Sequence, residues 1–175
     1  MRNVQTRLID APASTVGALM DTVAGPDDRL WPKATWPAIK LDRGLTSGSR
    51  GGHGSIRYFV SGYEPGRRIR FTFEPATGLD GYHELRVERI TKGQCRLVHE
   101  VAGRARGWVH LTWPLVIRWL HEALIHDLLD NAQRAATGEL PKPARWSPWV
   151  RLLRGTTARR GNTGRTKTTR EHQRA

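Results

Sequence analysis

Residues 112–138 read TWPLVIRWLHEALIHDLLDNAQRAATG, a stretch that predicts one long helix. Thr112 can cap the first turn, and Pro114 stands in that turn, where its missing N–H costs nothing. Gly138 can end the helix, because glycine readily adopts the left-handed conformation found after many helix C-termini. At 1.5 Å per residue the predicted helix is about 37 Å long.

One face of this helix is broadly apolar. At 100° per residue, its large side chains recur at the spacing of an amphipathic helix. A helix with so long an apolar face requires a surface of comparable length to pack on. The face is formed by Trp113, Val116, Ile117, Leu120, Ala123, Leu124 and Leu128.

The region before the helix can supply that surface as a sheet. Five short segments show the period-two alternation of half-buried strands. Turn signals at Glu64-Pro65-Gly66 and Lys92-Gly93 join neighbouring segments directly, which favours antiparallel pairing. The alternating positions are Ile39 and Leu41, Ile56 to Val60, Ile69 to Phe73, His83 to Val87, and Leu97 to Val101.

The N-terminal part predicts a strand followed by helices. Residues 4–10 read as the strand, and Pro12 opens a helix that Gly25-Pro26 ends. Residues 27–31 are interpreted as a second short helix, and the glycine-rich residues 48–54 as a connection between strands. The predicted order is β-α-α-β-β-β-β-β-α, an α+β fold with the helices on one face of an antiparallel sheet.

Composition narrows the class of protein. The chain has 175 residues, a net charge of +13 and one cysteine, Cys95. A lone cysteine excludes an internal disulfide and fits a reducing compartment. The N-terminus has no apolar run of signal-peptide length, and no stretch approaches the roughly 18 apolar residues of a membrane span. We therefore expect a cytoplasmic protein.

The basic charge is concentrated near the C-terminus. From Glu139 onward, ten Lys and Arg face two Asp and Glu, whereas residues 1–138 carry 19 and 14. Pro141-Lys142-Pro143 reads as a linker, and residues 146–153 as an amphipathic segment that packs on the domain or binds a membrane surface or partner. The predicted division is a globular domain at 1–138, a linker with this segment at 139–155, and a disordered basic tail at 156–175.

Several stretches resemble a known superfamily. Residues 9–13 (IDAPA), residues 63–71 (YEPGRRIRF) and the long last helix together resemble the START-like, birch-pollen-allergen-like helix-grip proteins. Residues 52–58 (GHGSIRY) and 113–129 look like an uncharacterised bacterial subgroup of the polyketide cyclase/dehydrase and lipid-transport branch (SRPBCC). The resemblance, over about residues 3–137, implies a helix-grip fold whose sheet wraps around the last helix and encloses a pocket for a hydrophobic small molecule. It implies no common catalytic motif.

Motifs of several enzyme classes are absent. Residues 48–54 lack the Lys-Ser/Thr of a phosphate-binding loop, and a strand follows them. His121 and His126 are five residues apart, hence about 140° apart around the helix, and cannot bind one metal ion together. No Gly-x-Ser-x-Gly elbow is present, and nothing marks Cys95 as a nucleophile. We expect no metal and no cofactor, and we assign no catalytic residue.

Two histidines are candidates for a ligand site. His83 and His99 each alternate with apolar residues of a predicted strand, which places them on the concave face. Polar groups among apolar neighbours orient ligands in hydrophobic pockets, although a histidine bonded within the core gives the same pattern. A two-residue turn at Lys92-Gly93 would contradict one of these faces, whereas a bulge or a longer turn would restore both.

Asp127 is an exception on the apolar face of the long helix. It lies within about 50° of the centre of that face. A carboxylate there needs a partner, for which Arg57, Arg104 and Arg106 are candidates. Asp127 is therefore either a structural anchor or a polar group of the pocket.

We expect the domain of residues 1–138 to bind a lipid-, aromatic- or polyketide-like molecule between sheet and helix. One alternative is a cyclase/dehydrase-type enzyme, in which His83, His99 or Tyr58 moves protons. Another is binding of nucleic acid or an anionic membrane through the basic tail. The expected ligand-binding residues are Tyr58, Phe71, Phe73, His83, Leu85, His99, Trp113, Ile117, Leu120 and Asp127.

Overall fold

The computed structural model describes residues 1–155, and the predicted disorder of residues 156–175 lies outside this part of the chain. Residues 148–155 are helical. The other elements are β1 (Arg2–Ile9), α1 (Ala13–Met20), β2 (Lys40–Leu41), β3 (Arg50–His53), β4 (Ile56–Glu64), β5 (Arg68–Phe73), η1 (Pro75–Thr77), β6 (Leu79–Arg89), β7 (Cys95–Ala105), α2 (Trp108–Thr112), η2 (Trp113–Ile117) and α3 (Arg118–Thr137).

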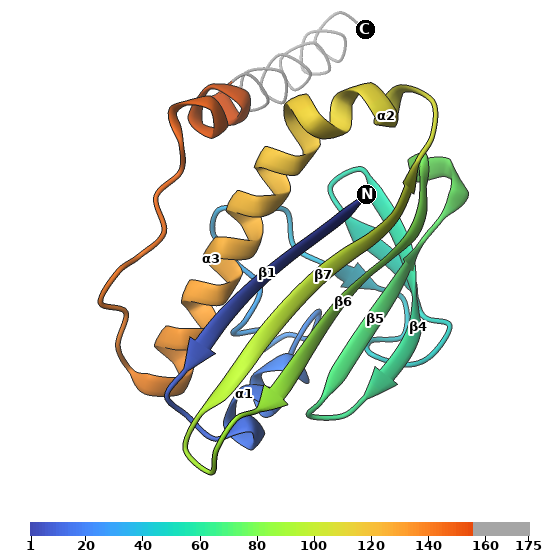
Figure 1. The fold of residues 1–175 in the computed structure, drawn as a ribbon. Helices are drawn as coiled ribbons and strands as arrows, with labels where there is room; N and C mark the ends of the chain where they lie inside the picture. The colour runs from blue at the N-terminus through green and yellow to red at the C-terminus, as the bar shows by residue number, and fades with distance from the viewer. Residues whose placement is uncertain (156–175) are drawn as a thin grey trace, which may run out of the picture.

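The strands of the described chain form one curved antiparallel sheet in the order β1-β7-β6-β5-β4-β3-β2. β1 pairs with β7, so the first strand lies beside the last one. The long helix crosses the inner side of this sheet (Figure 1). The predicted α+β helix-grip fold is confirmed.

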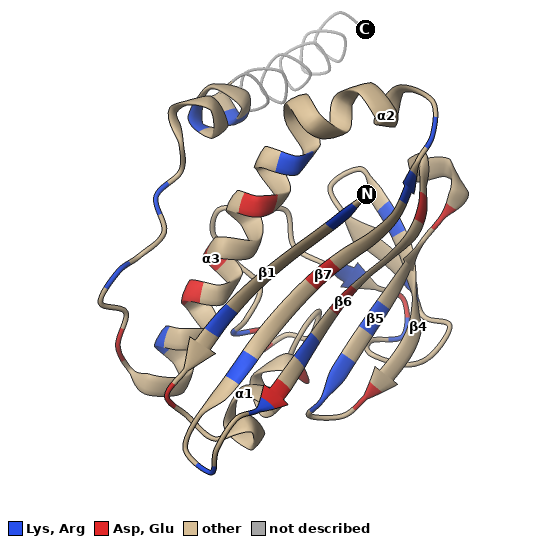
Figure 2. Cartoon of the chain, viewed as in Figure 1, with Lys and Arg blue, Asp and Glu red and all other residues tan. Residues whose placement is uncertain are grey.

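The two faces of the sheet differ in chemistry, as the alternation predicts. On β5, Ile69, Phe71 and Phe73 are buried on the inner face. Arg70 projects to the other face and pairs with Glu84 of β6 at 2.7 Å between Nε and Oε2. Figure 2 shows basic and acidic residues at intervals along β1 and β4 to β7. The inner face is therefore left for packing and for a cavity.

The connection between β6 and β7 decides which way the candidate histidines face. Arg89 pairs with Cys95, which leaves residues 90–94 as the turn. This longer turn keeps odd residues opposite odd ones, so His83 pairs with Val101 and His99 with Leu85. Both histidines consequently lie on the inner face.

The predicted helix at residues 27–31 is wrong. The Asp28 carboxylate accepts hydrogen bonds from the backbone N–H groups of Leu30 and Trp31, at 3.0 and 2.8 Å. Asp side chains compete in this way with helical hydrogen bonds and favour turns. The segment therefore forms a tight turn and places Trp31 in the core.

The glycine-rich connection contains a strand, β3, that was not predicted. A Cβ atom at Gly51 would collide with the carbonyl oxygen of Lys40, and one at Gly52 with that of Ile56. The two glycines thus let the neighbouring strands approach. Glycines in a sequence usually suggest a loop. Here this close strand pairing requires them, because a side chain at either position would collide with the neighbouring backbone.

The long helix begins earlier than predicted and is not uniform. It starts at Trp108, so Thr112 lies inside it, and its hydroxyl donates to the Trp108 carbonyl at 3.0 Å rather than capping the helix. The next turn, η2, is π-helical and contains Pro114, which cannot donate to a regular helical hydrogen bond. The helix ends at Gly138 with a positive φ of 79°, as predicted.

The segment after the long helix packs against it. The Ala144 N–H donates to Asp130 at 2.6 Å, and the Trp149 indole N–H donates to the Leu115 carbonyl at 2.9 Å. Val150 is buried. Within the described chain, none of the helices has the length and apolar character needed to span a bilayer.

Candidate functional site

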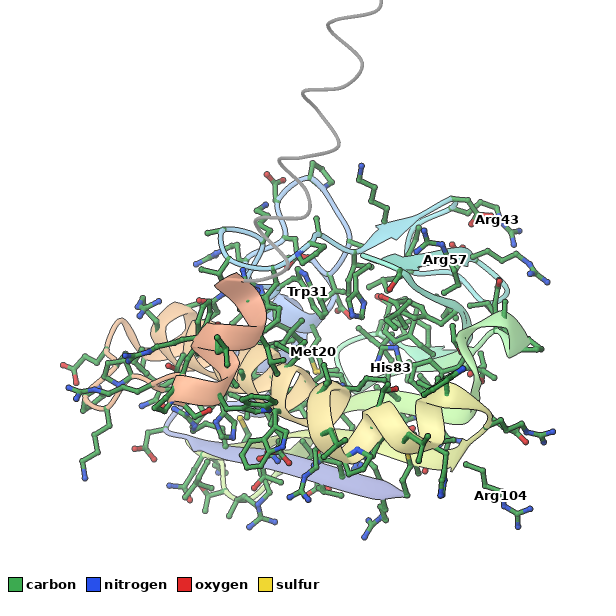
Figure 3. The ribbon with its side chains drawn as sticks, turned by 90° about the horizontal axis from the view of Figure 1, so that it is seen from above. Met20, Trp31, Arg43, Arg57, His83 and Arg104 are labelled. Atoms are coloured by element: carbon green, nitrogen blue, oxygen red, sulfur yellow. The ribbon has the colours of Figure 1, made fainter. Side chains whose placement is uncertain are left out.

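A cavity of about 380 Å³ lies between the inner face of the sheet and the long helix. Its walls come from β6, β7, η2 and α3, and from the segments around Trp36 and His53. Figure 3 looks into this region along the sheet and shows His83 in the interior, with Trp31 on the side of the loops. The volume is within the range typical of small-molecule sites.

Six of the ten residues predicted to bind a ligand line this cavity. Three of them, one phenylalanine and two histidines, lie on the sheet. The other three are large apolar residues of the long helix. The six are Phe73, His83, His99, Trp113, Ile117 and Leu120.

The other four lie elsewhere. Tyr58 and Phe71 are buried behind His83, with ring centroids 4.7 and 4.8 Å from its imidazole. They hold the histidine in place and are not among the lining residues. Leu85 is buried in the core beside His99. Asp127 lines a separate cleft.

Four histidines meet at the cavity, two of which were not predicted as site residues. The His99 ring lies 5.8 Å from that of His83 and 5.0 Å from that of His121, between centroids. His53 lies further along the wall, and its Nδ1 is 3.0 Å from the Tyr58 hydroxyl. His121 follows Leu120 and precedes Leu124 by three residues, a position on the apolar face from which it could have been identified.

Three imidazole nitrogens in this cluster have no hydrogen-bond partner among the described residues. They are His83 Nε2, His99 Nδ1 and His121 Nδ1, and each atom is buried. Buried polar atoms are normally paired, because leaving one unpaired costs about 1–3 kcal/mol. The three side chains line the apolar cavity, whereas the unpaired atoms themselves are covered by their neighbours.

The histidines are neutral at physiological pH. Burial lowers the pKa of His121 and of His53 to about 4. Burial, together with the neighbouring histidines, holds the pKa of His83 and His99 well below the ordinary value. Each neutral imidazole offers one donor and one acceptor, so the cavity can pair with hydroxyl and carbonyl groups alike.

The described part of the chain contains no group of three His, Cys, Asp or Glu side chains arranged to hold a metal ion. The four histidines at the cavity form no such group either. They come from four different elements and pack as rings against one another and against Tyr58, Phe71 and Phe73. The arrangement therefore offers hydrogen bonds and ring contacts rather than a coordination shell.

Asp127 anchors the C-terminal segment instead of facing the cavity. Its carboxylate accepts hydrogen bonds from the indole N–H of Trp36 at 2.7 Å and from that of Trp146 at 3.0 Å. The expected arginine partner is replaced by these two donors. The guanidinium of Arg154 stacks on both indoles, 4.2 and 4.7 Å from their centroids, and reaches the cavity wall. The C-terminal segment thus completes one side of the cavity.

No protein-family profile matches the chain, and no curated protein matches it in sequence. Solved structures do share its fold. A protein from Thermobifida fusca, solved by NMR, superposes with a TM-score of 0.60 at 16% identity, covering 83% of this chain and 99% of that one. The crystal structure of CalU16 from Micromonospora echinospora gives a TM-score of 0.55 at 17% identity, covering 89% and 82%.

A third similar structure is the di-domain ARO/CYC protein BexL from the BE-7585A biosynthetic pathway. The TM-score is 0.53 at 18% identity, over 77% of this chain and 46% of that one. At these identities the likeness is one of fold. The chain is an α+β protein with the helix-grip arrangement, a curved antiparallel sheet closed by a long helix over a cavity.

Proposed function

We propose that the chain binds one hydrophobic small molecule, lipid-, aromatic- or polyketide-like, in the cavity between sheet and helix, as a member of the SRPBCC superfamily. The apolar rings and aliphatic side chains on the wall would cover the body of the ligand. The histidines would meet its oxygen atoms. The fold shared with CalU16 and BexL supports a small-molecule site of this kind.

One observation carries this proposal: three neighbouring histidines, each with a buried nitrogen that has no partner among the described residues, line an otherwise apolar cavity. A cavity that only completed a core would favour apolar side chains, because an unpaired polar atom destabilises the fold. His83, His99 and His121 each carry one such atom. The ligand best suited to the cavity is therefore largely apolar and bears hydroxyl or carbonyl groups.

Acid–base catalysis is the second candidate because two histidines stand on the cavity wall, although burial lowers their pKa and so weakens them as bases. A neutral imidazole can accept a proton from a bound carbonyl compound and return it, as cyclisation or dehydration requires. His83 and His99 stand on the cavity wall. Tyr58 suits this role less well, because burial raises the pKa of its hydroxyl and the hydroxyl bonds to His53 away from the lining.

A matched pair of ligands tests the proposed site. Isothermal titration with 2-naphthol and with naphthalene compares the same apolar body with and without a hydroxyl group. We expect 2-naphthol to bind about fivefold more tightly, because one hydrogen bond contributes about 1 kcal/mol. His99→Phe should retain binding of naphthalene and lose the preference. Absence of binding to either compound, or equal affinities in the native chain, would refute the proposal.

Turnover would separate the two candidates. A carbonyl ligand identified on the protein from its own host would be incubated with the native chain and with His83→Phe and His99→Phe. The binding proposal expects unchanged ligand by mass spectrometry, and the catalytic candidate expects a cyclised or dehydrated product that the variants fail to form.

A further inference from the structure

One face of the long helical region is apolar and exposed. Trp108 is 79% exposed and Leu115 is 64% exposed. Leu111, between these two in sequence, and Trp119, one turn after Leu115, each have about half of their surface accessible. Spacings of three, four and four residues put these four side chains on one side of α2, η2 and the start of α3. The opposite side of the same turns lines the cavity through Trp113 and Ile117.

The C-terminal segment enlarges this exposed face. The hydrogen bond from the Trp149 indole to the Leu115 carbonyl places Trp149 beside the helix, and Leu152 follows one turn later. Figure 1 shows the helical residues 148–155 at the same end of the molecule as α2. Single exposed apolar residues are common, but a contiguous group of large ones marks an interaction surface. We name this surface the apolar ridge, formed by Trp108, Leu111, Leu115, Trp119, Trp149 and Leu152.

Arginines border the apolar ridge. Arg104 and Arg106 precede α2, Arg118 lies between two ridge residues, and Arg151 lies between Trp149 and Leu152. Arg106 and Arg118 pair with carboxylates, whereas Arg104 and Arg151 form no ion pair within the described chain. Figure 3 shows Arg104 extending away from the body of the protein. Because two of these four arginines have no carboxylate partner within the described chain, the border of the ridge is positive.

We propose that the apolar ridge docks on the surface of an anionic lipid bilayer. Tryptophan and leucine would enter the headgroup region, and the bordering arginines would contact lipid phosphates, as in amphipathic helices that lie in the membrane interface. A second copy of the chain suits the ridge less well, because it would bring two strongly positive molecules together. Docking would set the helical wall of the cavity against the bilayer. The proposal rests on the ridge and its charges and not on the identity of any cavity ligand.

Vesicle co-sedimentation tests the docking. The native chain would be mixed with phosphatidylcholine vesicles with and without phosphatidylglycerol, at low and at high salt. We expect binding to the anionic vesicles that weakens as salt rises, because the arginine contacts are screened. The triple variant W108Q/L111Q/L115Q should bind them at least tenfold more weakly. The control L8Q/I90Q removes exposed apolar side chains of similar size away from the ridge and should bind as the native chain does.

Circular dichroism and the melting temperature would show that both variants are folded. Equal binding of the ridge variant and the control, equal binding to neutral and anionic vesicles, or no binding of the native chain would overturn the proposal. So would sedimentation velocity data showing that the native chain dimerises without lipid and that the ridge variant does not. None of these results depends on whether 2-naphthol binds, so failure of the docking and failure of the proposed function are distinguishable.

Discussion

His121 illustrates how burial sets the chemistry of a single residue. It lies on the cavity side of α3, and burial lowers the pKa of its imidazole to about 4. Burial likewise lowers the pKa of His83 and His99, so all three rings are uncharged at neutral pH. A neutral ring can both donate and accept, which a protonated one cannot. These rings can therefore form hydrogen bonds with uncharged hydroxyl and carbonyl groups of a ligand.

Stability should fall as the pH is lowered from about 6.5 to 4. In this window the unfolded chain binds protons at its histidines, and the folded chain does not bind one at His121 until about pH 4. A difference of this size lowers the free energy of unfolding by roughly 3 kcal/mol at its full extent. His121→Phe should flatten the dependence of the melting temperature on pH. The same change at the exposed His110 should not, and equal profiles for the two variants would contradict the assignment.

Asp127 should contribute to stability through its two indole donors. Asp127→Leu leaves the N–H groups of Trp36 and Trp146 without their acceptor, at about 1–3 kcal/mol for each. Asp127→Asn retains an acceptor oxygen and should cost less than half as much. Urea denaturation measures both variants. Equal losses of stability in Asp127→Leu and Asp127→Asn would mean that the negative charge, and not the hydrogen bonds, stabilises the fold at this position.

The long helix serves two surfaces because its turns present apolar side chains on both sides. Trp113 and Ile117 face the cavity, and Leu115 between them faces outward. The π-helical turn that contains Pro114 lies at this position. Such turns are frequent at functional sites. The same helical region thus lines the cavity on one side and exposes apolar side chains to the surroundings on the other.

Helix α1 depends on a close contact with the turn between β4 and β5. A Cβ atom at Gly17 would collide with the carbonyl oxygen of Gly66. Gly17→Ala should therefore destabilise the protein by about 1–3 kcal/mol, although alanine favours helices more than glycine does. Thermal unfolding measures the effect. Gly93→Ala, where the added methyl group meets open space, is the matched control, and equal stability of the two variants would contradict this packing.

The overall fold was predictable because its strands each bury one face and its last helix buries one stripe. These patterns determine a curved sheet over a helix wherever side chains alternate regularly, as in β5. The prediction failed where local interactions decide the conformation. Asp28 stabilises a turn in place of a helix, and the two central residues of β3, Gly51 and Gly52, have no side chains to alternate.

The cavity was predictable in part. Alternation placed His83 and His99 on the inner face, and helical spacing placed Trp113, Ile117 and Leu120 there. His53 lies in the glycine-rich strand, where the sequence carries no periodic signal. The contribution of Arg154 depends on the C-terminal segment folding back onto Trp36, and that contact joins residues far apart in the sequence.

Ligand binding in the cavity between sheet and helix can be tested with variants that fill the cavity. Titration with the fluorophore N-phenyl-1-naphthylamine would compare the native chain with Ile117→Trp, which fills the cavity, and Leu115→Trp, which adds the same side chain outside it. Val101→Phe fills the cavity from the sheet side as a second variant, and circular dichroism would show that each is folded. We expect one binding site in the native chain and in Leu115→Trp, and at least tenfold weaker binding in both filled variants. Binding that persists unchanged when the cavity is filled, or no binding to the native chain, would contradict a ligand site at this position.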